Sequence, residues 1–201
     1  MHNFIICGHS HSRRFGSFTR SPYNGADIRN LGLARGDVRF GFHGEGGMRI
    51  NQLNRPGSAS NLFFELFSGA KVCILFIGDN DVLSYAPQYL AEVILEKASI
   101  IKNNYQFESV FVAPLLPRRE GAQGNIFRYN RDAARVNRFL KVKSIDYNVQ
   151  IMKELFPFPA TNAMVYERQA DLFLPDGVHL NALGNRRLYN HMRGMAIRST
   201  K

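Results

Sequence analysis

The sequence has 201 residues, of which 45% are hydrophobic and 21% are charged, an ordinary composition for one globular domain spanning residues 1–201. No apolar run approaches the roughly 20 residues that a membrane span requires, and the two cysteines show no zinc-site spacing. The formal net charge of +10 favours association with nucleic acid or another polyanion, without establishing that as the function.

The first predicted element is a short apolar strand, Phe4–Cys7, which meets Gly8 and a small polar turn. A short basic helix over Arg13–Arg20 follows the turn. Ser10 lies in the turn, at the head of this helix, where backbone N–H groups are unpaired and favour negative charge. The residues before the strand carry no basic leader region, so we expect an intracellular protein.

Further along the chain, strand and helix patterns alternate. The continuous apolar run 71–77 predicts a central parallel strand that is buried on both faces. Four glycines in 41–47 indicate a backbone with unusual dihedral angles or a close approach. The other predicted strands are 37–42, 109–114 and 162–165, and the predicted helices are 61–67, 87–103, a basic helix that ends near 145, and 181–197.

This alternation predicts a three-layer α/β/α sandwich around a parallel sheet of about five strands. Ligands bind outside the carboxyl ends of the strands in such sheets. The polar clusters that follow the strands should therefore lie along one edge of the sheet. Cys7 and Cys73 both fall in predicted strands and are expected to be reduced core thiols.

The basic helix carries four arginines at spacings of three and four residues, which places them along one side: Arg128, Arg131, Arg135 and Arg138. The neighbouring positions form an apolar stripe that should face the sheet: Tyr129, Ala133, Val136 and Leu140. The arginine row fits either a solvated helix face or a surface that binds polyanions.

Three residues meet the needs of acyl transfer. Ser10 offers a hydroxyl group, and His179 follows Asp176 by three residues in a turn before the last helix. That spacing lets the carboxylate reach Nδ1 while Nε2 faces outward to take the serine proton. The Ser10 N–H, a glycine N–H near Gly47 and the Asn80 amide are candidate donors to an oxyanion.

These residues resemble the sequence blocks of the SGNH, or GDSL-type, esterase and lipase superfamily. Gly8-His9-Ser10 is similar to the first block, Gly46-Gly47 to the second, Gly78-Asp79-Asn80-Asp81 to the third and Asp176-Gly177-Val178-His179 to the fifth. The resemblance implies a flavodoxin-like strand order and a serine ester hydrolase that acts through an acyl-enzyme. It implies a catalytic triad of Ser10, Asp176 and His179, an oxyanion hole of Ser10, Gly47 and Asn80, and neither cofactor nor metal.

One position departs from the family pattern, because His9 stands where the family usually has aspartate. The Gly-His-Ser variant is similar to animal members of the family, some of them linked to transposable elements. The change removes a negative charge beside the nucleophile, which bears on rate and substrate preference. His9, His11, Arg118 and Arg119 are candidate substrate-binding residues, and His11 is expected in the loop on its solvent side.

Two other functions remain open at this point. A metal-dependent phosphoesterase could use His9, His11 and residues 78–81 as ligands, but the first strand does not end in an acidic ligand. An SGNH-fold binding module with weak or lost catalysis could use the basic surface to bind nucleic acid or another polyanion. For the esterase we expect a small-molecule or lipid-like ester with a short acyl chain, and the loop 115–125 could select an anionic substrate.

Overall fold

The computed structural model describes residues 2–21, 30–33, 38–119, 122–156, 158 and 171–199. In these ranges five parallel strands form one sheet in the order β2-β1-β3-β4-β5. This is the flavodoxin-like order that the resemblance to the SGNH superfamily implies. The strands are β1 (His2–Gly8), β2 (Val38–Gly44), β3 (Val72–Phe76), β4 (Ser109–Val112) and β5 (Gln150–Ile151).

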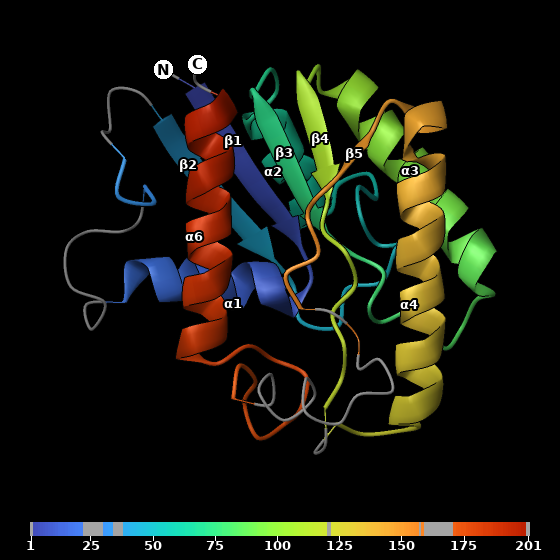
Figure 1. The fold of residues 1–201 in the computed structure, drawn as a ribbon. Helices are drawn as coiled ribbons and strands as arrows, with labels where there is room; N and C mark the ends of the chain where they lie inside the picture. The colour runs from blue at the N-terminus through green and yellow to red at the C-terminus, as the bar shows by residue number, and fades with distance from the viewer. Residues whose placement is uncertain are drawn as a thin grey trace.

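Helices cover both faces of the sheet, so the fold is a three-layer α/β/α sandwich (Figure 1). One apolar core joins the sheet to α2 (Ala59–Leu66), α3 (Pro87–Asn104) and α4 (Ile126–Lys143), which the short η2 (Ser144–Tyr147) follows. The other core joins the opposite face to α1 (Ser10–Arg20) and α6 (Ala182–Ser199). All five residues of β3 are buried, because neighbouring strands and both helix layers enclose it.

Local sequence explains where the principal helices begin. Pro87 stands at the start of α3, where its missing N–H group breaks no helical hydrogen bond. The Asn125 side chain accepts a hydrogen bond from the Arg128 N–H and caps α4. The predicted apolar stripe of α4 is buried against the sheet: Tyr129, Ala133, Val136 and Leu140.

Most predicted elements are confirmed within one to three residues of their bounds, but two expectations differ. The helix α1 begins at Ser10 rather than near Arg13, because the His9 side chain caps it and draws the polar turn into the helix. The strand expected at 162–165 lies outside the described residues, as do Asp37 and most of the turn after Ser21. The strand next to β4 is β5, a two-residue element that the sequence pattern does not reveal.

Cys7 and Cys73 are free and fully buried, as predicted, and burial raises the pKa of both thiols. None of the helices in the described part of the chain combines the length and the apolar character that a membrane span requires.

Candidate active site

Ser10 lies at the carboxyl end of β1, where the chain turns into α1. Gly8 makes this turn possible. Its φ is +147°, and a Cβ atom there would lie 1.9 Å from the Phe76 carbonyl oxygen of β3. A larger residue would force the two strands apart, so the turn that presents Ser10 requires glycine.

A chain of hydrogen bonds joins Ser10 to the loop before α6. The Ser10 Oγ lies 2.9 Å from His179 Nε2, and His179 Nδ1 lies 2.7 Å from Asp176 Oδ2. These residues are separated by up to 169 positions in the sequence. The order of groups is the one in which an imidazole can take a serine proton while a carboxylate holds the imidazole in place.

The backbone of the same loop holds the Asp176 carboxylate. Its Oδ1 atom accepts hydrogen bonds from the N–H groups of Val178 and His179, each at 2.9 Å. Burial alone would raise the pKa of Asp176, but these bonds and the His179 side chain outweigh it and lower the pKa from 3.8 to about 2. The carboxylate is therefore ionised at neutral pH.

The candidate oxyanion donors come from three segments. One N–H of the Asn80 amide donates to the Met48 carbonyl at 3.0 Å, and among the described residues the other has no partner. Gly47 precedes Met48, so it lies beside Asn80, and its φ of +72° is a conformation that favours glycine. Asn80 lines a cavity beside Ser10, whereas Gly47 does not.

We call the space beside Ser10 the Ser10 cavity, which Ser10 lines together with Asn80, Arg118 and Tyr129 among others. Its volume is about 20 Å³. A space of roughly 10–15 Å³ on this measure holds one water molecule. The cavity therefore admits a group about the size of a methyl.

His9, which is buried, and Asp79, which is partly buried, form a pair in the wall of this cavity. His9 Nε2 lies 2.7 Å from Asp79 Oδ2, and His9 is 1% exposed. Burial raises the pKa of Asp79, but His9, His11 and the Leu116 N–H outweigh it and hold this pKa well below its usual value. The sequence has no aspartate at position 9, but Asp79, which follows β3, places a carboxylate next to the residue at that position.

His11 was expected on the solvent side of a loop, and that expectation is wrong. It is 5% exposed, lies in the first turn of α1, and also lines the Ser10 cavity. Its ring lies between those of His9 and His179, at centroid distances of 5.1 and 5.4 Å. Burial, with His9, His179 and Arg14, outweighs the opposing effect of Asp79 and lowers the pKa of His11 from 6.5 to about 3, so the ring stays neutral.

Of the two candidate substrate-binding arginines, only Arg118 lies at the Ser10 cavity. Arg118 lines the Ser10 cavity, and its guanidinium group lies 4.0 Å from the centre of the Tyr129 ring. Arg119 does not line the cavity and is 4% exposed, with its guanidinium group 5.3 Å from the Phe173 ring centre. Its backbone N–H donates to the Gly177 carbonyl at 2.7 Å, inside the loop that carries His179.

Sequence reasoning considered Asp79 only as part of the third block and as a possible metal ligand, and it placed Tyr129 only in the core stripe. Both contribute to the site, because the Tyr129 hydroxyl donates to Asp79 Oδ1 at 3.1 Å. The sequence did offer one signal for Asp79: an acidic residue at the end of a strand could pair with the histidine at position 9.

The third-block residue Asp81 is buried and accepts a hydrogen bond from the Ile50 N–H at 3.0 Å, which holds the loop after Gly47.

The alternatives find less support. The described residues contain no group of three or more His, Cys, Asp or Glu side chains that could hold a metal ion.

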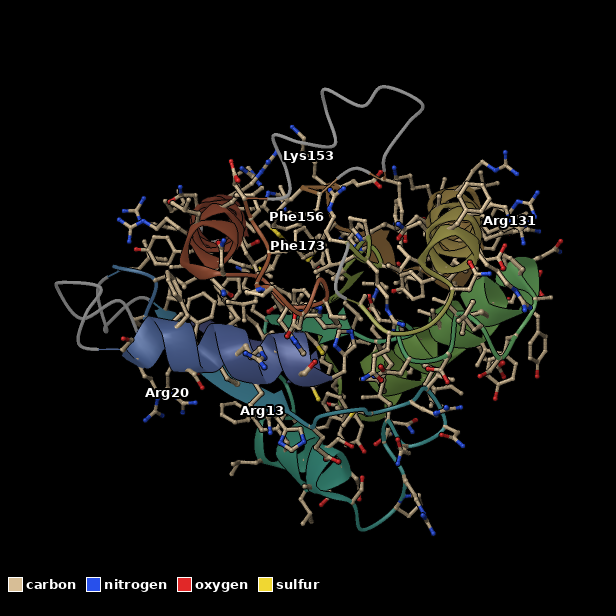
Figure 2. All side chains as sticks on the ribbon, turned by 90° about the horizontal axis from the view of Figure 1, so that it is seen from below. Arg13, Arg20, Arg131, Lys153, Phe156 and Phe173 are labelled. Carbon is tan, nitrogen blue, oxygen red and sulfur yellow. The ribbon has the colours of Figure 1, made fainter. Side chains whose placement is uncertain are left out.

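The arginine row of α4 bears on the polyanion-binding alternative. Arg128 and Arg131 both contact Asp132, at 3.7 and 3.0 Å, which offsets part of the charge of this row. Figure 2, which looks onto the edge where the strands end, shows Arg131 on α4 at the opposite side of the view from Arg20 on α1. Polyanion binding stays a prediction.

Comparison with solved structures identifies the fold. The chain aligns over 98% of its length with 97% of a lipase/acylhydrolase from Enterococcus faecalis, at a TM-score of 0.63 and 16% identity. It aligns over 100% with 99% of a carbohydrate acetylesterase family member from Sinorhizobium meliloti (TM-score 0.67, 10% identity). It also aligns over 99% with 94% of an acetyl xylan esterase variant from Geobacillus stearothermophilus (TM-score 0.56, 13% identity).

No model of a known protein family and no curated protein sequence matches the chain. The structural neighbours carry the α/β fold of the SGNH hydrolases, and the resemblance seen in the sequence blocks is confirmed at the level of the fold.

Proposed function

We propose that this chain, which has the fold of the SGNH hydrolases, is a serine ester hydrolase that acts on small esters with a short acyl group. The observation that carries the proposal is the Ser10–His179–Asp176 chain of hydrogen bonds, 2.9 and 2.7 Å long, at the carboxyl edge of the sheet. The structural neighbours that act on esters, among them acetylesterases, support the same reaction class.

In the proposed reaction, Ser10 Oγ attacks the ester carbonyl carbon while His179 Nε2 takes the hydroxyl proton. The carbonyl oxygen becomes an oxyanion, which the Ser10 N–H, the Gly47 N–H and the Asn80 amide stabilise. The carbon–oxygen bond to the alcohol then breaks, and His179 returns the proton to the leaving alcohol. Asp176 holds the imidazole and stabilises its charged form.

The product of this first half is an acyl group on Ser10. Water then attacks the acyl carbon and gives one proton to His179. The bond to Ser10 Oγ breaks, the carboxylic acid leaves, and His179 returns the proton to Ser10. No cofactor takes part in these steps.

The size and polarity of the Ser10 cavity support a short acyl group. Its volume of about 20 Å³ suits an acetyl methyl group, and its lining includes imidazole, amide and guanidinium groups rather than a continuous apolar surface. A longer chain would have to extend out of this cavity. Arg118 is the lining residue best suited to an anionic group on the substrate.

Hydrolysis of p-nitrophenyl esters of graded chain length tests the proposal. The acetate should have a kcat/KM about tenfold or more above that of the octanoate, since the cavity cannot hold the longer chain. Ser10→Ala should lower kcat by at least about 10³-fold and leave the melting temperature close to that of wild type. Ser17→Ala, an exposed serine of the same helix, is the matched control and should keep full activity.

A Ser10→Ala variant with wild-type turnover would contradict the proposal. So would a folded wild-type protein that hydrolyses none of the esters and does not react at Ser10 with a fluorophosphonate.

A further inference from the structure

Asp79 is bonded through both carboxylate oxygens to three different segments of the chain. Oδ2 lies 2.7 Å from His9 Nε2, in the turn between β1 and α1. Oδ1 accepts hydrogen bonds from the Leu116 N–H, in the loop after β4, and from the Tyr129 hydroxyl of α4, each at 3.1 Å. A carboxylate with this many donors is held in one place, and it holds its donors in turn.

His9 is oriented toward Asp79 by its own helix. As the cap of α1, its Nδ1 accepts the His11 N–H at 3.4 Å, so the ring proton is on Nε2 and is donated to Asp79. Both nitrogens of His9 therefore have partners within the protein. His9 lines the cavity without a free nitrogen to offer to substrate, which argues against its candidate role as a substrate-binding residue.

The loop that Asp79 holds also reaches the loop of His179. We call residues 113–119, which follow β4, the β4 loop. Asn130 of α4 bonds both the N–H and the carbonyl of Arg118, at 2.8 and 2.9 Å. One residue further on, the Arg119 N–H donates to the Gly177 carbonyl at 2.7 Å. Gly177 lies between Asp176 and His179, so a shift of the β4 loop would be transmitted to both.

We infer that His9 and Asp79 act together as positioning residues of the proposed hydrolase, through a continuous set of contacts from the β1 turn to the His179 loop. His9 orients Asp79, and Asp79 holds the β4 loop at Leu116 and α4 at Tyr129. The β4 loop in turn holds Gly177. The pair takes the place of an aspartate at position 9, which in this chain would set two carboxylates against each other in a buried site. The expected effect on kcat rests on the proposed function, whereas the expected effect on the position of His179 does not.

Four variants test it. Asp79→Asn removes the charge at nearly constant shape, His9→Leu removes the donor, and the double variant removes both. His9→Gln is the conservative control, because its side-chain amide can still donate to Asp79. Activity toward p-nitrophenyl acetate is expressed per active site, counted by fluorophosphonate titration, so that a loss of folded protein does not count as a loss of rate.

Asp79→Asn and His9→Leu should each lower kcat per active site about tenfold or more while changing KM by less than about threefold, the split expected when catalytic groups are misplaced by a small distance. The double variant should be no worse than the more affected single variant, because the two residues act as a unit. His9→Gln should stay within about threefold of wild type. Losses that multiply in the double variant, or a kcat per active site that does not change, would overturn the inference.

A second readout does not depend on turnover. The ¹⁵N chemical shifts of the His179 imidazole, assigned with a His179→Gln variant, report its hydrogen bonds to Asp176 and Ser10. They should move in Asp79→Asn and His9→Leu and stay at wild-type values in His9→Gln. If wild type shows no Ser10-dependent hydrolysis, the proposed function fails while these shifts still decide the positioning role, and shifts that are the same in all variants would refute it.

Discussion

Replacing Asp176 with asparagine should abolish most of the proposed esterase activity without unfolding the protein, because of the way in which its carboxylate is hydrogen-bonded. Asp176 Oδ1 accepts two backbone N–H groups, each at 2.9 Å, while Oδ2 faces His179 Nδ1 at 2.7 Å. The amide oxygen of the asparagine must take the place of Oδ1, because only an acceptor suits two N–H donors. Its NH₂ group then faces Nδ1 and forces the ring proton onto Nε2, where it blocks transfer from Ser10.

The size of the effect follows from the alternative amide orientation. Turning the amide over would set its NH₂ group against two backbone N–H groups and leave them without acceptors, at a cost of about 2 kcal/mol each. The two lost hydrogen bonds together cost about 4 kcal/mol. Only about one molecule in 10³ therefore has the turned-over amide, which is the orientation that leaves Nε2 free to accept the Ser10 proton. We therefore expect kcat to fall by about 10³- to 10⁴-fold, close to the loss known for a wrong histidine tautomer in such a triad.

The assay is p-nitrophenyl acetate hydrolysis at neutral pH, with thermal unfolding measured on the same samples. Asp171→Asn, an exposed aspartate of the same loop, is the matched control and should be unaffected. A kcat for Asp176→Asn within tenfold of wild type, in a folded protein, would refute the tautomer argument and the role proposed for Asp176.

The lowered pKa of Asp176 predicts that the free energy of unfolding depends on pH, and the Asp176→Asn variant tests this. The pKa of Asp176 lies at about 2 in the folded protein, below its ordinary 3.8, so the ionised carboxylate stabilises the fold above the ordinary value. That contribution is lost as the pH falls from about 4 to about 2. Asparagine does not titrate, so the stability difference between wild type and variant should shrink over this range, and a constant difference in acid unfolding would contradict the assigned pKa.

Two further substitutions examine the rest of the site. Asn80→Ala removes a proposed oxyanion donor and should lower kcat for p-nitrophenyl acetate by about 10²-fold or more; an unchanged kcat would exclude Asn80 from the oxyanion hole. Arg118→Ala should raise KM for an anionic ester, such as the p-nitrophenyl monoester of succinate, by about tenfold and leave the neutral acetate nearly unaffected. Arg135→Ala, an exposed arginine of α4, is its control, and equal effects on both esters would show that Arg118 does not select charge.

The sequence was sufficient to predict the order of most strands and helices. The continuous apolar run of β3 and the apolar stripe of α4 are local patterns, so each indicates its element without knowledge of the neighbours. The two-residue β5 could not be predicted this way, because its pairing with β4 rests on a sheet already formed. The start of α1 was missed because a histidine is an uncommon helix cap.

The sequence by itself also determined which residues form the candidate active site. Ser10 follows a strand, Asp176 and His179 share one turn, and parallel strands end at a common edge, so their meeting follows from the fold class. Only the tertiary structure decided that His9 meets Asp79, 70 residues away, and that Asp79 in turn holds Leu116 and Tyr129. Such contacts depend on the paths of several loops at once, and those paths are set by packing across the whole sheet edge rather than by the sequence near any one residue.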